Sequence, residues 1–109
     1  MAIHRDQRRM DAREVLDEFE TWLLRARSAQ VRTAAAYTAR VAGFAEWLPA
    51  PIDESLRTLT AATVIEWVNL EAARGLRAST LGKQMVMLRS FLQYCYRSAR
   101  TGQDFAGVV

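Results

Sequence analysis

The chain has 109 residues, of which 50% are hydrophobic and 25% are charged, and its formal net charge is +3. This length supports one small domain with a single hydrophobic core. No uncharged apolar run approaches the roughly 18 residues that a membrane span requires, and the polar N-terminal sequence is unlike a signal peptide. A single cysteine excludes an internal disulfide. We therefore expect a cytoplasmic protein that does not contact membranes.

An amphipathic helix is predicted close to the N-terminus. The first ten residues show no apolar period, so 1–10 is predicted to be a flexible arm, whose basic HRDQRR cluster is either solvated or in contact with nucleic acid. From Asp11 to about Ala29, apolar residues share one face, and acids occupy the early turns, where the helix dipole favours them. The ordered part of the chain is therefore expected to begin with a helix that buries one face.

The second predicted helix spans Gln30 to Leu48 and ends before two prolines. Its outer face is almost without large side chains and comprises Arg32, Ala35, Ala36, Ala39 and Gly43. Small residues allow a helix backbone to approach a phosphate backbone or another helix closely, although alanine also favours helix formation by itself. Arg32 and Arg40, with Thr33 beside them, are the candidates for polar contacts on this face.

A connector and a third helix follow. Residues 49–59 are predicted to form the one substantial connector, and Thr60 is predicted to cap a helix from Ala61 to Ala73. The predicted apolar side of this helix comprises Val64, Ile65, Trp67, Val68 and Ala72. Glu66 and Glu71 are predicted on the outer side, so the helix is expected to pack on the bundle through its apolar side alone.

The fourth predicted helix, Ser79 to Arg97, differs from the others in its charge, because residues 74–100 include six basic residues and no acid. Its apolar stripe comprises Leu81, Met85, Leu88, Leu92 and Cys95. Cys95 is therefore interpreted as a core residue and not as a reactive thiol. The opposite face offers positive charge and hydroxyl groups, so it is either solvated surface or a surface for a polyanion such as nucleic acid. Residues 101–109 are predicted to form a short helix or the start of a linker.

No catalytic site can be assembled from these residues. The only histidine, His4, lies in the predicted arm, and the sequence has neither metal-ligand spacing nor a glycine-rich phosphate loop. We therefore expect no catalytic residue, no metal site and no cofactor in this chain.

Three blocks of the sequence carry a resemblance to a known family. They read Thr33-x-x-x-Tyr37-x-x-x-Val41-x-x-Phe44, then Leu59-Thr60-x-x-x-Val64-x-x-Trp67-Val68, then Gly75-Leu76-x-x-x-Thr80-Leu81-x-x-x-Met85-x-x-Leu88-Arg89-Ser90-Phe91. In this order and spacing they resemble the N-terminal core-binding (SAM-like) domain of tyrosine recombinases, the phage-integrase family. The resemblance implies that residues 11–100 form an all-α bundle of four or five helices, which is one half of a clamp around duplex DNA.

The resemblance also implies which side chains face the DNA, because in the family the second and fourth helices contact phosphates and a few bases. Carried over by position, it gives Thr33, Ala36 and Arg40, then Arg77, Ser79, Thr80, Lys83, Gln84, Met87 and Ser90. Their charge adds Arg32 and Arg89 to the predicted phosphate contacts. Phosphate neutralisation is expected to supply most of the affinity, and the hydroxyl and amide groups a limited base preference.

The sequence departs from the family pattern at both helix starts and at its C-terminal end. A small capping residue is common in the family where this chain has Gln30 and Arg77, so Ser28 and Ser79 are alternative caps that would shift each helix start. The family's catalytic residues belong to a C-terminal domain, and nothing in this chain matches them. We therefore expect a non-enzymatic piece or relative of a recombinase. Its expected partners are duplex DNA, the catalytic domain of the same polypeptide and other recombinase protomers.

Two other functions compete with this interpretation. The main alternative is a helical protein-interaction module without DNA binding, since the small residues of the second helix also suit a partner helix. A repressor with a helix-turn-helix is disfavoured, because the connector at 49–59 is too long for the tight turn of that motif.

Overall fold

The computed structural model describes residues 11–109, which form helices and loops without a strand. The elements are α2 (Ala12–Arg25), α3 (Val31–Trp47), α4 (Ile52–Arg57), α5 (Ala61–Ala72), α6 (Ala78–Arg97) and the 3-10 helix η1 (Ala106–Val108). The prediction of an all-α bundle is confirmed. The predicted arm at 1–10 lies outside the described residues.

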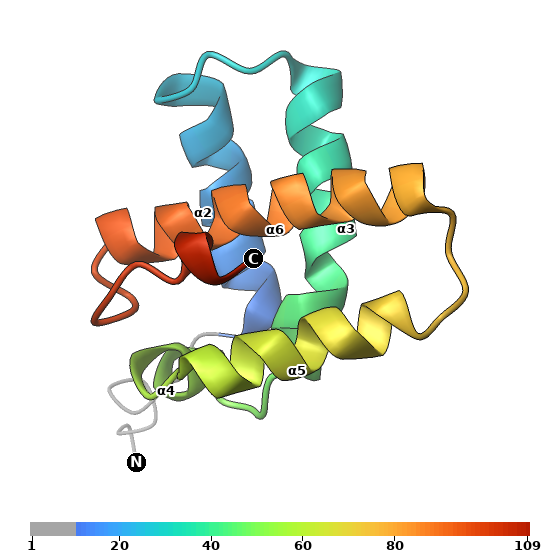
Figure 1. Cartoon of the computed structure of the whole chain (residues 1–109). Coiled ribbons are helices and arrows are strands. Elements are labelled where there is room, and N and C mark those ends of the chain that lie inside the picture. The colour runs from blue at the N-terminus through green and yellow to red at the C-terminus, as the bar shows by residue number, and fades with distance from the viewer. Residues whose placement is uncertain (1–10) are drawn as a thin grey trace.

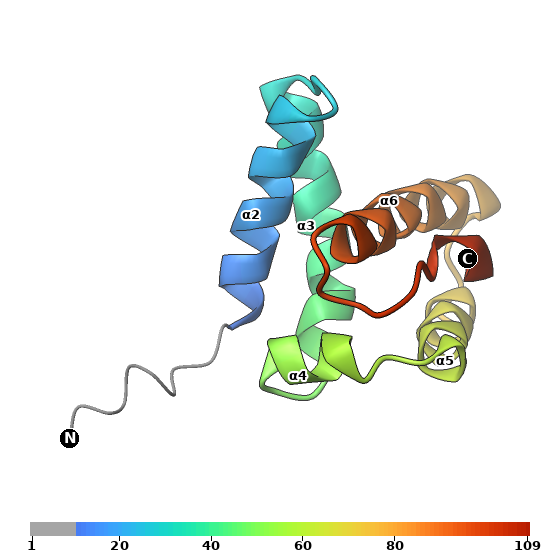
Figure 2. The same cartoon turned by 90° about the vertical axis from the view of Figure 1, so that its left-hand side faces the viewer.

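The helices are arranged around an antiparallel pair. α2 and α3 lie side by side and run in opposite directions, and α6 crosses both of them (Figure 1). The view at right angles shows α5, α6 and η1 on one side of the α2–α3 pair (Figure 2). η1 contacts both α5 and α6, so the chain after α6 folds back onto the bundle. Within residues 11–109, no helix covers the other side of the α2–α3 pair (Figure 2).

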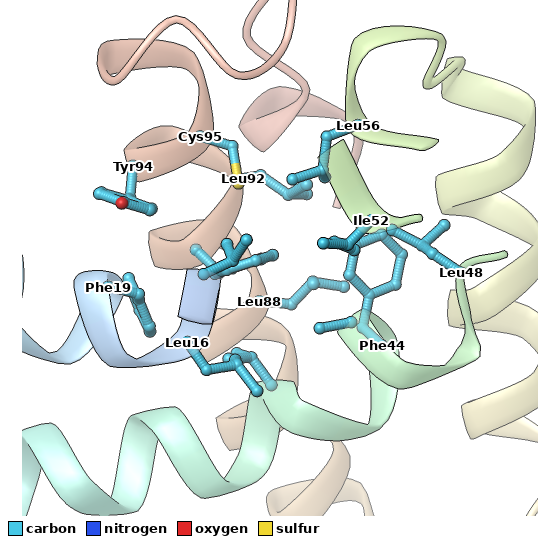
Figure 3. Close-up of a cluster of buried hydrophobic side chains, with 14 of the residues drawn as sticks. Leu16, Phe19, Phe44, Leu48, Ile52, Leu56, Leu88, Leu92, Tyr94 and Cys95 are labelled. Atoms are coloured by element: carbon cyan, nitrogen blue, oxygen red, sulfur yellow. The ribbon is translucent and has the colours of Figure 1, made fainter. Parts of the chain in front are cut away.

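The core lies where α6 crosses α2 and α3. Figure 3 shows Phe19 of α2, Phe44 of α3 and Leu88 of α6 converging there. Phe91 of α6 is fully buried, and its ring centroid lies 5.2 Å from that of Phe19 and 6.3 Å from that of Phe44. Both contacts are edge-on, an arrangement that the charge distribution of aromatic rings favours. These aromatic contacts link α6 to both members of the pair.

Only the C-terminal half of α6 is anchored in this core. Its buried residues are Leu88, Phe91, Leu92, Tyr94 and Cys95. Leu81 and Met85, which begin the predicted apolar stripe, are half-buried. The stripe is therefore the packing side of α6, as predicted, but its first two residues lie at the edge of the core.

Tryptophan side chains join α5 to the C-terminal half of α3. The ring centroid of Trp67 lies 6.0 Å from that of Phe44 and 5.3 Å from that of Trp47. A Cβ atom added at Gly43 would lie 3.4 Å from the Trp67 ring, at the short limit of ordinary van der Waals contact. Gly43 was predicted on the small-residue face of this helix. Because Gly43 has no side chain, Trp67 of α5 packs closely against α3 at this point.

The chain after α6 is tied to α2 by Arg100. Its guanidinium forms an ion pair with Glu18 of α2, and its Nε donates to the Tyr94 hydroxyl at 3.4 Å. The guanidinium carbon also lies 5.8 Å from the centroid of the Tyr94 ring. Burial raises the pKa of Tyr94, so this hydroxyl stays neutral near pH 7. Arg100 thereby holds the C-terminal end of α6 against α2.

Two predicted boundaries are wrong. α2 ends at Arg25 and not near Ala29, because the chain turns through Ser28, whose φ is 53°. The predicted connector at 49–59 contains α4, whose residues Ile52 and Leu56 are buried one helical turn apart. That spacing indicates a helix, whereas the two prolines before it favour a loop, and the prediction followed the prolines.

Three residues of α5 lie on the side opposite to the predicted one, and one of them is Ala72, which was expected inside and is exposed. Ile65 was expected inside and is 46% exposed, whereas Glu71 was expected outside and is 6% exposed. Glu71 follows the buried Val64 by seven residues, which is two helical turns, so the two share a face. The Nη1 atom of Arg74 lies 3.0 Å from the Glu71 carboxylate and balances its charge. Arg74, one helical turn after Glu71, therefore allows an acid on the buried face of α5.

Cys95 is buried, as predicted, and burial raises the pKa of its thiol to about 12. Because the thiolate is the reactive form, we expect the native protein to resist a maleimide near neutral pH and to be labelled fully in denaturant. Mass spectrometry of samples taken over time measures the labelled fraction. Labelling of the native protein at the rate of a free thiol would contradict this expectation.

Candidate nucleic-acid interface

The candidate site spans α3 and α6, the two helices that cross in Figure 1. Most of its predicted residues are exposed: Arg32, Thr33, Ala36, Arg40, Arg77, Ser79, Lys83 and Arg89. The remaining four are half-buried: Thr80, Gln84, Met87 and Ser90. Ser79, Lys83 and Ser90 recur at spacings of four and seven residues, so they lie along one face of α6.

The structure brings Thr33 of α3 and Ser90 of α6 together. Both line a cavity of about 160 Å³ at the end of the bundle where α2 passes into α3. Tyr37 and Arg27 line the same cavity. The predicted faces of the two helices therefore meet at this point.

Gln84 and Arg89 lie away from that surface. Gln84 precedes the buried Leu88 and Phe91 by four and seven residues, and its Oε1 atom is excluded from solvent without a hydrogen-bond partner. Arg89 lies near the C-terminal end of the described chain, because its Nη2 atom donates to the Val109 carbonyl at 3.1 Å. Neither residue enters the DNA contacts proposed below.

The two candidate helices also differ from their neighbours at their N-termini. α2 is capped by the Asp11 side chain and α5 by the Thr60 side chain. α3 and α6 begin after Gln30 and Arg77, which make no side-chain cap, and neither helix has an acid in its first turn. The helix starts are therefore not shifted to a serine cap. Their first backbone N–H groups remain available to water or an anion.

Arg27, which precedes α3, was missed by the sequence prediction. Its Nη1 atom donates to Gln93 Oε1 of α6 at 3.0 Å, and its guanidinium carbon lies 5.4 Å from the centroid of the Trp22 ring. The sequence pattern predicted a helix through to Ala29, with Arg27 inside it. The early end of α2 at Arg25 places it beside α6 instead.

The other side of the α2–α3 pair has the opposite charge. A cavity of about 290 Å³ there is lined by three acids, one arginine and small residues. The acids are Asp17, Glu20 and Glu46. Ala35 and Ala39, predicted on the same outer face as Ala36, line this acidic groove. The small-residue face of α3 is therefore divided between two surfaces of unlike charge.

A family model described as "Phage integrase, N-terminal SAM-like domain" matches residues 16–99. The chain belongs to this family. The match covers α3, α4, α5, α6 and most of α2. Membership of the phage-integrase family links the domain to integrases and recombinases and suggests a tyrosine recombinase as the parent protein. Searches of curated proteins and of solved structures return no significant match.

Two further features of this SAM-like domain concern membranes and metal ions. None of its described helices combines the length and apolar character needed to cross a bilayer. Residues 11–109 also contain no group of three or more His, Cys, Asp or Glu side chains that could hold a metal ion.

Proposed function

We propose that this domain binds duplex DNA through α3 and α6, as one half of the clamp of a tyrosine recombinase. The observation that carries the proposal is that Thr33 of α3 and Ser90 of α6 line one cavity together with Arg27, while a separate groove between α2 and α3 is lined by three acids. DNA carries negative charge along its whole length, so a protein with separated charge presents its basic side to it.

Phosphate neutralisation provides most of the affinity in this proposal. The exposed cations to which we assign phosphate contacts are Arg32 and Arg40 of α3, Arg77 before α6, and Lys83 of α6. Thr33, Ser79 and Ser90 add hydroxyl groups that contact phosphates or base edges. Ala36 supports close approach of the α3 backbone. Thr80 and Met87, which are half-buried on α6, border this surface.

The remaining parts of the proposal concern the parent protein. A C-terminal domain of the same polypeptide provides the strand-cleaving residues, other recombinase protomers assemble on the same DNA, and the protein acts in the cytoplasm. This domain then contributes no catalytic residue. Its role is to orient the duplex for a reaction that another domain performs.

The salt dependence of binding tests the proposal. We expect a labelled 30-base-pair duplex, roughly three helical turns long, to bind with a slope of log K against log salt of about −3.6, as for about four neutralised phosphates. Fluorescence anisotropy at a series of salt concentrations measures this slope. Binding that ignores salt, or no binding at low salt, would refute DNA recognition by this domain.

A protein-interaction module is the second candidate function, and the acidic groove of α2 and α3 favours it. Its carboxylates and small residues suit a basic helix of another protein. A stable complex with a protein partner, combined with no retardation of duplex DNA in a gel, would support this function over the first.

A further inference from the structure

We infer that the cavity formed by Arg27, Thr33, Tyr37 and Ser90 holds one backbone phosphate of the bound duplex. The inference rests on the proposed function and makes it more specific, because it assigns an anchoring contact to an arginine outside the two DNA-facing helices. The cavity is lined by the end of α2, the loop after it, α3 and α6. Two parts of the chain that are distant in sequence, 23–37 and Ser90 of α6, therefore shape it.

The cavity is large enough for such a group. Its volume of about 160 Å³ is several times the roughly 10–15 Å³ that one water molecule requires. A phosphate group of DNA has a central atom and four oxygens. It therefore fits together with some of its hydration water.

Arg27 is held in position at this cavity. The amide of Gln93 binds one of its N–H groups, and the face of the guanidinium lies over the ring of Trp22. A guanidinium has five N–H donors in a planar fork, so others remain for a ligand. Because these contacts already restrain the side chain, less conformational freedom is lost when an anion binds.

The hydroxyl groups at the cavity are not used within the protein. Thr38 of α3 donates its hydroxyl to the Ala34 carbonyl at 2.8 Å, as threonines within helices often do. Within residues 11–109, the hydroxyls of Thr33, Tyr37 and Ser90 make no hydrogen bond to another residue. Tyr37 and Ser90 are half-buried, and their hydroxyl groups are open to water or to a ligand. Phosphate oxygens would accept from all three.

The charge of the site favours an anion. No carboxylate lines the cavity, and Arg27 forms no ion pair with any described residue. Leu23 and Ala29 complete the lining with apolar surface and bring no charge that competes for Arg27. A guanidinium with three hydroxyl donors and no competing acid matches a phosphate.

Arg27→Gln tests the assignment. We expect this variant to bind the 30-base-pair duplex about tenfold more weakly at low salt, with a salt slope about 0.9 smaller in magnitude, because one phosphate contact is lost. The matched control is Arg13→Gln, which removes the same charge from the acidic groove and should leave the slope unchanged. Thermal unfolding of both variants checks that each is folded.

A double-mutant cycle distinguishes a specific phosphate-binding cavity from a general effect of charge. Ser90→Ala should weaken binding a few-fold in the wild-type chain and have no effect in the Arg27→Gln background, since both residues would contact one group. The inference is wrong if the wild-type chain binds DNA but Arg27→Gln has no more effect than Arg13→Gln. It is also wrong if the effects of Arg27→Gln and Ser90→Ala on affinity simply add. In both cases DNA binding itself stands. If the wild-type chain does not bind DNA, the proposed function itself fails.

Discussion

Replacing Arg40 and Lys83 together by glutamate should weaken binding of duplex DNA about 100-fold at about 0.1 M salt. Arg40 is exposed on α3 and Lys83 on α6, so the pair tests both proposed helices at once. Each substitution removes a phosphate contact and adds a repulsive charge. The loss should be similar for unrelated sequences, because phosphate contacts carry no sequence information. Anisotropy titrations with two or more duplexes measure it.

The control for this experiment is Arg57→Glu. Arg57 is exposed on α4, at the other end of α3 from the proposed surface, and its reversal changes the net charge by the same amount as each single reversal (Figure 1). We expect a loss of affinity of less than about threefold, from the change in overall charge alone. If Lys83→Glu by itself leaves the affinity unchanged, α6 is not the DNA-facing helix.

Phe91→Ala should destabilise the domain by about 3–5 kcal/mol. Phe91 is fully buried, and it contacts an aromatic ring from each of α2 and α3. Its truncation leaves a cavity at the crossing of three helices, which neighbouring rings can fill only in part. Because domains of this size are stable by about 5–15 kcal/mol, a large part of the total would be lost. Urea unfolding followed by circular dichroism measures the change.

Tyr96→Ala is the matched variant on the same helix. Tyr96 is 47% exposed, so removing its ring should change the free energy of unfolding by less than about 1 kcal/mol. A cost for Phe91→Ala as small as that of Tyr96→Ala would mean that the aromatic cluster is not the centre of the core.

The four longer helices, α2, α3, α5 and α6, were predictable from sequence because each has a regular apolar period, whereas the short α4 was missed. The start of α5 at Ala61 agrees with the prediction, and that of α6 at Ala78 differs from it by one residue. The errors occur where a local feature overrides that period. The turn at Ser28 shortens α2, and the Arg74 side chain permits a buried Glu71. Neither feature is visible in the spacing of apolar residues alone.

The candidate site was predictable in part. Resemblance to the family and helical spacing together identified Thr33 and Ser90, which line one cavity. The position of Arg27 could not be predicted, because it depends on where α2 ends and on a contact with Gln93, which is 66 positions away in sequence. Gln84 was predicted to face DNA, because a polar residue in a basic helix suggests an outward side chain. In the structure its side-chain carbonyl oxygen is buried.

The uneven anchoring of α6 has a consequence for how the domain responds to a ligand. The first half of the helix contributes no fully buried side chain, so its hydrogen bonds can open without disturbing the aromatic cluster around Phe91. Local opening there costs less free energy than unfolding of the domain. A partner that contacts Lys83 therefore stabilises this half of α6 first. The aromatic contacts of Phe91 with α2 and α3 lie outside that half and remain in place when it opens.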